Sequence, residues 1–123
     1  MADTATVNRW IEAYLRAWES NAPDDIGRLF TDDAVYLTEP YSPPVVGRDA
    51  IVEFWLKAQD APDDWTFEWS PVALEGDTAV IEGRASYDSK SDYRNIWVIG
   101  FAPDGRAHSF TEWYMVEPGS DSD

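Results

Sequence analysis

Two glutamates occupy positions at which a carboxylate could take up a proton. Glu39 follows residues 34–38, which have strand character, and directly precedes Pro40 in a proline-rich segment. A carboxylate that faces an apolar hollow has a raised pKa and can transfer protons near neutral pH. Glu39 is therefore a candidate proton acceptor. The alternative interpretation is a solvated carboxylate at the rim of a loop.

Glu112 is the second candidate, because period-two alternation places it between Phe110 and Tyr114 on one face of the last expected strand. A carboxylate among aromatic side chains needs a polar partner, and Arg84 or Asn95 could supply one from a neighbouring strand. The pattern leaves two interpretations open. Glu112 either acts on a ligand or forms a structural ion pair.

Residue counts exclude several other kinds of site. The chain has no cysteine and one histidine, His108, so it has no thiol nucleophile and no zinc site built on two or three histidines. His108 follows a turn closely, which predicts an exposed strand position. No GxSxG nucleophile elbow, phosphate loop or dinucleotide-binding fingerprint is present. We therefore expect no metal and no cofactor.

Charge and composition restrict the partners and the compartment. Nine basic residues against 24 acidic ones give a net charge of −15, which argues against nucleic-acid and membrane binding. No run approaches the ~18 apolar residues of a membrane span, and the first ten residues do not have the pattern of a signal peptide. The absence of cysteine fits a reducing compartment. We expect a cytoplasmic protein.

The aromatic content predicts an apolar pocket. Seven Trp, six Tyr and five Phe are more large rings than a core of 123 residues normally needs, so some should line a cavity or an interface. We expect the cavity to hold an apolar small molecule. The residues predicted to contact it are Trp18, Tyr36, Trp55, Trp69, Arg84, Asn95, Trp97 and Trp113.

The spacing of apolar residues predicts the elements that position these side chains. Residues 7–20 and 47–58 follow the i, i+3, i+4 spacing of amphipathic helices. A short helix is expected over residues 24–30, then a turn at Asp32-Asp33 and a brief strand over 34–38. Four longer strands joined by short turns are expected at 65–74, 78–87, 93–101 and 106–117.

This order of elements predicts an α+β fold. Three N-terminal helices should pack on a strongly curved antiparallel sheet and enclose a conical hollow. Residues 1–117 are expected to form one domain, followed by an acidic tail over 118–123. Both faces of the strand over residues 93–101 are substantially apolar, so one should meet the helices and the other a second subunit. A homodimer through the sheet face is the expected assembly.

Several segments together resemble the SnoaL-like branch of the NTF2-like superfamily. They are the helix with Trp10 to Trp18, the run Ile26-Gly27-Arg28-Leu29-Phe30-Thr31-Asp32-Asp33-Ala34-Val35-Tyr36, Pro40, Gly47-Arg48-Asp49-Ala50-Ile51, and Phe110-Thr111-Glu112-Trp113-Tyr114. The resemblance implies a curved sheet with helices across its open side, a deep and mostly apolar pocket, and a dimer. Members of the superfamily include ketosteroid isomerases, polyketide cyclases, epoxide hydrolases and non-catalytic binding proteins, so the residues must decide the function.

The resemblance also implies site residues. The tyrosine that polarises a carbonyl in ketosteroid isomerases falls on Tyr14, which could equally be a core aromatic. Their general-base aspartate is matched by Glu39 after a one-residue shift, and by Thr38 without it. Their neutral carboxylic acid aligns with Trp97, which departs from the pattern. If Glu112 and Arg84 both face the hollow opposite Glu39, they resemble the acid–arginine–acid arrangement of limonene-type epoxide hydrolases.

The leading hypothesis is a cofactor-free isomerase or cyclase that abstracts a proton next to a carbonyl. In this hypothesis Glu39 accepts the proton and Tyr14 donates a hydrogen bond to a substrate oxygen. One alternative is a small-molecule binding module without chemistry, and another is an epoxide-hydrolase-like enzyme. A further alternative is a structural dimer whose cavity is filled by its own tryptophans.

Overall fold

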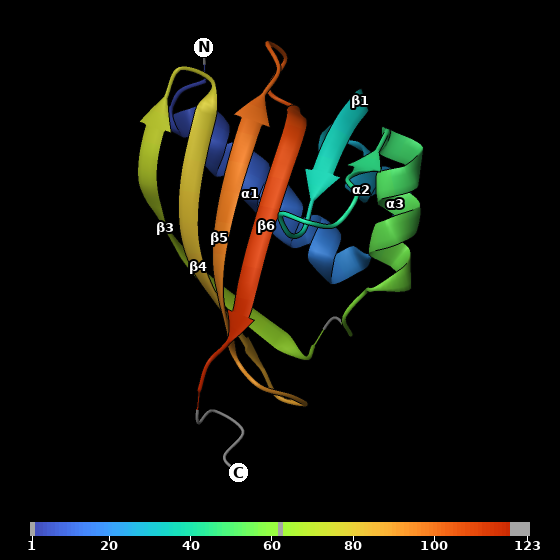
Figure 1. Ribbon diagram of the computed structural model, residues 1–123, viewed down its shortest axis with the longest axis vertical. Helices are drawn as coiled ribbons and strands as arrows, with labels where there is room; N and C mark the ends of the chain where they lie inside the picture. Colours follow the sequence, from blue (N-terminus) through green and yellow to red (C-terminus); the bar gives the residue numbers. More distant parts are fainter. Residues whose placement is uncertain (1, 62, 119–123) are drawn as a thin grey trace.

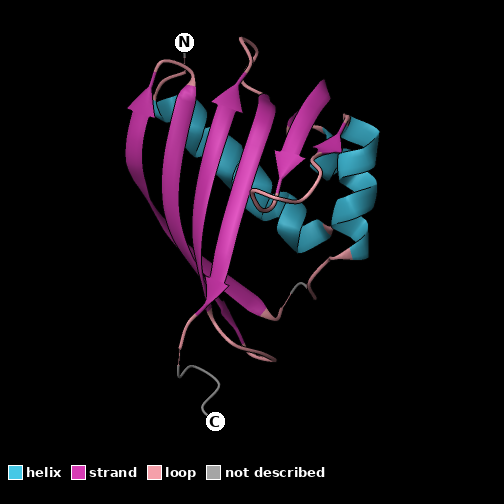
Figure 2. Ribbon diagram, viewed as in Figure 1, coloured by secondary structure: helices cyan, strands magenta, loops and turns pink. Residues whose placement is uncertain are grey.

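The computed structural model describes residues 2–61 and 63–118, which form three helices and one six-stranded sheet. The helices are α1 (Thr4–Ser20), α2 (Pro23–Gly27) and α3 (Arg48–Lys57), and the strands are β1 (Phe30–Leu37), β2 (Val45–Val46), β3 (Trp65–Glu75), β4 (Thr78–Tyr87), β5 (Tyr93–Phe101) and β6 (Ala107–Val116). Helix α1 crosses behind the long strands, and α3 lies beside β1 (Figure 1). Figure 2 shows all the helices to one side of the sheet or at its edge, which confirms the α+β class.

The sheet is mixed, and this corrects the expectation of an antiparallel sheet. Its strand order is β2-β1-β6-β5-β4-β3. The meander of β3 to β6 is antiparallel, as predicted. Strand β1 instead pairs in parallel with β6. Because helix α3 and four strands separate β1 from β6 in the chain, the connection is long enough for a parallel pairing, which a hairpin cannot make.

The predicted elements were largely correct, with errors between Pro23 and Val46. Helix α2 has only five residues and ends at Gly27, so the helical layer consists of two long helices and one short one. Asp32 and Asp33, predicted as a turn, lie within β1, where a register shift interrupts the pairing with β6. The two-residue strand β2 was not predicted. Residues 119–123 of the expected tail lie outside the described residues.

The inner face of the sheet packs against α1 through aromatic rings. Tyr14 and Trp97 have ring centroids 4.5 Å apart, and Trp10 and Phe110 are 5.4 Å apart. On the same face Phe67 stacks on Trp97 at 4.9 Å with an interplanar angle of 15°. These rings are the centre of the core, because Trp97 and Phe110 are fully buried.

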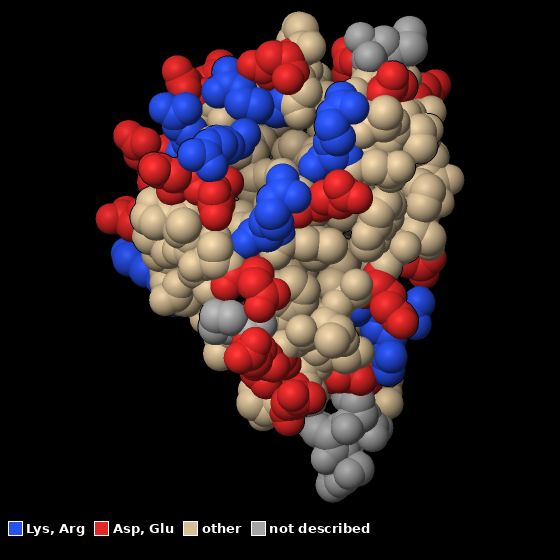
Figure 3. Space-filling model, turned by 180° about the vertical axis from the view of Figure 1, so that it is seen from behind, with Lys and Arg blue, Asp and Glu red and all other residues tan. Residues whose placement is uncertain are grey.

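Acidic side chains are spread over the surface seen from behind the sheet, and basic side chains gather mainly in one half of it (Figure 3). In the part of the chain that the structure describes, no helix is both long enough and apolar enough to cross a membrane.

Gly83 allows the Phe67 ring to lie directly on the backbone of β4, and Gly83→Ala tests this packing. An added Cβ would overlap the ring of Phe67, which Trp97 holds from the other side. We expect the free energy of unfolding in urea to fall by about 1–3 kcal/mol, the usual cost of overpacking a core. Gly27→Ala is the matched control, since its Cβ would lie 3.6 Å from the nearest atom. Equal stability of the two variants would contradict the packing.

Candidate functional site

A pocket of about 320 Å³ opens between α1, the C-terminal part of α3 and the inner face of β5 and β6. Its wall consists largely of aromatic side chains, with a few polar groups among them. Of the residues predicted from the sequence, those that line it are Tyr14, Trp18, Tyr36, Trp55, Asn95 and Glu112. The structure therefore brings together six predicted residues from five separate elements.

The Glu112 carboxylate accepts three hydrogen bonds from buried side chains. The Tyr36 hydroxyl donates to its Oε1 at 2.9 Å. Asn95 Nδ2 and Trp97 Nε1 donate to its Oε2 at 3.2 and 3.1 Å. All three donor residues are buried, so the carboxylate is held at the deep end of the pocket. No ion pair joins Glu112 to a lysine or arginine among the described residues.

Burial raises the pKa of Glu112 above its ordinary value of 4.5, and the negative charge of Asp60 adds to this rise. The hydrogen bonds from Trp97, Tyr36 and Asn95 act in the opposite direction, because they stabilise the charged form. The net effect is a carboxylate that takes up a proton at a higher pH than an exposed glutamate. A raised pKa makes this carboxylate a stronger base than an exposed glutamate.

Tyr14 and Tyr36 both line the pocket and are buried. Burial raises the pKa of both hydroxyls well above 10, and the charge of Glu112 raises them further. Both tyrosines therefore stay protonated. The single proton of Tyr36 is donated to Glu112.

A second polar group, which the sequence did not predict, lies around Asp60. Its Oδ2 accepts hydrogen bonds from Trp18 Nε1 at 3.1 Å and from the Tyr87 hydroxyl at 3.0 Å. Burial is the main cause that raises the pKa of Tyr87, and the negative charge of Asp60 is the second. Lys90 Nζ lies 3.4 Å from Asp60 Oδ1 and 4.4 Å from the centre of the Tyr87 ring. Asp60 lies in the segment between α3 and β3.

The structure corrects the expected position of Glu39. Glu39 is exposed on the turn after β1 and does not line the pocket. Its carboxylate accepts a hydrogen bond from the Ser42 hydroxyl at 2.7 Å. The side chain is therefore the solvated rim carboxylate of the alternative interpretation. Thr38, which matches the family position without the one-residue shift, lines the pocket instead.

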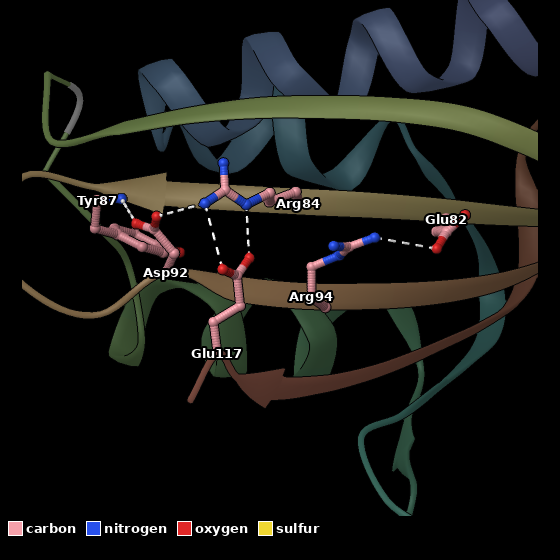
Figure 4. Close-up of polar contacts among 6 residues, drawn as sticks. All are labelled: Glu82, Arg84, Tyr87, Asp92, Arg94 and Glu117. Carbon is pink, nitrogen blue, oxygen red and sulfur yellow. Dashed lines mark hydrogen bonds and ion pairs between the residues drawn. The ribbon is translucent and has the colours of Figure 1, made fainter. Parts of the chain in front are cut away.

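Arg84 is not the partner of Glu112. It points away from the helices on the outer face of the sheet, where its guanidinium lies between Asp92 and Glu117 at 3.0 and 2.6 Å (Figure 4). These contacts raise the pKa of Arg84 and lower that of Glu117. The acid–arginine–acid arrangement expected from the epoxide-hydrolase resemblance is therefore absent from these residues. Alternation along β4 explains the error, because Gly83 and Ala85 are the buried residues.

The remaining predicted tryptophans do not line the pocket. Trp97 is buried behind Glu112 and donates to it. Trp69 is partly buried on β3, away from the pocket. Trp113 is 47% exposed, because it follows Glu112 on β6 and faces the opposite side of the sheet. Within residues 2–61 and 63–118, no group of three His, Cys, Asp or Glu side chains is placed to hold a metal ion.

Comparison with known proteins identifies this architecture. The family model described as "SnoaL-like domain" matches residues 11–117. No protein with a curated description matches the chain.

Several solved structures share the fold. An NTF-2 like protein of unknown function from Burkholderia xenovorans LB400 superimposes with a TM-score of 0.74 at 17% identity, over 92% of this chain and 85% of that one. The epoxide hydrolase/cyclase-like enzyme SalBIII, which acts in pyran ring formation in the polyether salinomycin, superimposes with a TM-score of 0.72 at 18% identity. The match covers 94% of this chain and 95% of that one. A steroid delta-isomerase from Pseudomonas aeruginosa superimposes with a TM-score of 0.68 at 18% identity, over 94% of this chain and 83% of that one. These similarities establish an NTF2-like fold.

The raised pKa of Glu112 predicts a specific pH dependence of stability. The folded protein favours the protonated form of Glu112 over the ionised form. The stability that Glu112 contributes is therefore fully present below its unfolded-state pKa, near 4.5, and is lost as the pH rises through its folded-state pKa. The free energy of unfolding of the wild type, minus that of Glu112→Gln, should therefore fall as pH increases from about 4.5. Urea unfolding at a series of pH values measures this difference. Glu39→Gln is the exposed control, and parallel curves for wild type and Glu112→Gln would contradict the raised pKa.

Proposed function

Because this chain belongs to the SnoaL-like domain family, we propose that it binds a small, largely apolar molecule in the pocket and that Glu112 acts there as the general base of a cofactor-free proton transfer. The role that Glu39 had in the sequence-based hypothesis passes to Glu112. The observation that carries the proposal is the position of this carboxylate, which lies at the deep end of an aromatic pocket and is held there by three buried donors.

The geometry leaves Glu112 able to accept a further proton. Its Oε2 already accepts two hydrogen bonds, from Asn95 and Trp97, whereas Oε1 accepts one, from Tyr36. A carboxylate oxygen has two lone pairs, so Oε1 keeps one for a ligand. The three donors also fix the orientation of the carboxylate, which a general base needs before the substrate arrives.

The reaction class that fits is isomerisation or cyclisation. One structural relative is described as a steroid delta-isomerase and another as an epoxide hydrolase/cyclase-like enzyme. Both kinds of chemistry require a proton to be moved by a positioned side chain in a water-poor pocket. Glu112 supplies such a group, and eight aromatic side chains line the pocket around it.

A second candidate is a binding module without chemistry. It is favoured by the same three hydrogen bonds, because donors that stabilise the charged carboxylate make it a weaker base. In this case Glu112 would orient a bound molecule by accepting a hydrogen bond and would not exchange a proton with it.

Turnover by Glu112→Gln separates the two candidates. We expect wild-type turnover of a compound from a panel containing a β,γ-unsaturated cyclic ketone, a hydroxy-epoxide and an aliphatic epoxide. Removing a general base should reduce the rate about 100-fold or more. Glu39→Gln, on the exposed turn, should keep the wild-type rate. An unchanged rate in Glu112→Gln would remove Glu112 from the mechanism, and binding of panel compounds without turnover would favour the binding module.

The outer face of the sheet supports a second proposal, that two copies associate through it. Ile96 and Trp113 are register partners there, and with Met115 on β6 they expose 38%, 47% and 72% of their surfaces. These apolar side chains form a continuous patch on the side opposite the helices. Exposed apolar patches of this kind mark interaction surfaces.

The charges beside this patch are compatible with self-association. Arg84 pairs with Asp92 and Glu117, and Arg94 pairs with Glu82 at 3.3 Å (Figure 4). Both arginines of this face therefore neutralise neighbouring acids, in a chain whose net charge is −15. These ion pairs reduce the negative charge that two copies would bring together at this face.

Trp113→Glu tests the association. By sedimentation equilibrium we expect the wild type at about twice 13.9 kDa and the variant near 13.9 kDa, because a charge in the centre of an apolar interface is costly to desolvate. Tyr41→Glu is the control, since Tyr41 is 99% exposed on the loop between β1 and β2. A wild type that sediments as a monomer would overturn this proposal.

A further inference from the structure

The side-chain oxygen of Asn95 is a feature of the pocket that the proposed reaction does not use. Asn95 lies on the inner face of β5, lines the pocket and is only 6% exposed. Its Nδ2 donates to Glu112, whereas its Oδ1 has no hydrogen-bond partner among the described residues. A buried amide oxygen without a donor is unfavourable, so a bound molecule that brings a donor would be stabilised there.

Two buried donors next to Asn95 are already used. The hydroxyl proton of Tyr36 and the indole N–H of Trp97 both go to Glu112. Asn95 Oδ1 and the Glu112 carboxylate keep acceptor lone pairs at the deep end of the pocket.

This arrangement discriminates between kinds of ligand. A ligand carbonyl at this position would bring no donor and would leave Asn95 Oδ1 unsatisfied. A ligand hydroxyl or ammonium would donate to that oxygen and to Glu112 Oε1. The rest of the ligand would lie against the aromatic rings that form most of the wall, which favours a flat and apolar body.

We propose that the ligand of this pocket carries an O–H or N–H donor on an otherwise apolar body and presents it to Asn95 Oδ1 and Glu112. The deep end of the pocket is then an acceptor site and not an oxyanion hole. This inference rests on the first part of the proposed function, that the pocket binds a small molecule, and it does not depend on proton transfer by Glu112.

A matched set of two-ring probes tests the inference. The donors are 2-naphthol, with a neutral hydroxyl, and 2-(aminomethyl)naphthalene, with an ammonium group. The controls are 2-methoxynaphthalene and 2-acetylnaphthalene, which have acceptor oxygens only, and 2-methylnaphthalene, which has no polar group. Quenching of tryptophan fluorescence reports binding, since Trp18 and Trp55 line the pocket. We expect at least one donor probe to bind about tenfold more tightly than every control probe.

Two variants connect this preference to the assigned atoms. Asn95→Leu keeps the branched shape of the side chain and removes Oδ1 together with the Nδ2 donor to Glu112. It should weaken binding of the preferred donor probe about tenfold, with little change for the control probes. Tyr36→Phe removes a donor to Glu112 but keeps Asn95 Oδ1, so the preference for donors should remain. Circular dichroism confirms that each variant is folded before its binding is compared.

The outcomes separate the two levels of the proposal. Preference for 2-naphthol identifies a hydroxyl ligand, and preference for the amine that weakens with salt identifies an ammonium ligand. Equal binding of all five probes, or tightest binding of 2-acetylnaphthalene, would overturn the acceptor site while leaving ligand binding intact. No binding of any probe, the hydrocarbon included, would overturn the proposed function itself.

Discussion

The contact between α1 and the inner face of the sheet is the constraint on which the rest of the structure depends. Trp10 and Tyr14 lie against Trp97 and Phe110, and these rings set both the direction of α1 and its distance from the strands. Further along the helix, Trp18 is also a wall of the pocket. The pocket therefore exists because one aromatic helix is held across a sheet that it does not fill completely.

The side of the sheet on which Glu112 lies depends on an irregularity in the β5–β6 ladder. The register shifts between Gly100 and Phe101, where His108 is the extra residue of β6. Before the shift Ala107 faces inward opposite Phe101, and after it Glu112 faces inward opposite Trp97. Without the extra residue Glu112 would point to the outer face, because a one-residue slip reverses every side chain of a strand.

Much of the fold could be predicted, because α1, α3 and the four long strands carry clear periodicity. The parallel pairing of β1 with β6 could not be predicted, because it joins segments that are distant in the chain and no local pattern encodes it. The site was predicted in part. Alternation placed Glu112 among aromatics, but choosing Asn95 over Arg84 as its partner required the register. Glu39 was misplaced because Ser42 and solvent satisfy its carboxylate outside the pocket.

The substitution at Trp97 explains how one pocket architecture can change its polarity. The resemblance implied a neutral acid at this position, donating to a substrate oxygen together with a tyrosine. In this chain Trp97 carries an indole N–H, and the acid lies on the next strand as its register partner, Glu112. The indole donates to that acid at 3.1 Å, and the Tyr36 hydroxyl donates to the same carboxylate at 2.9 Å. These two donors are therefore directed to a protein anion, while Asn95 Oδ1 is an acceptor without a partner among the described residues.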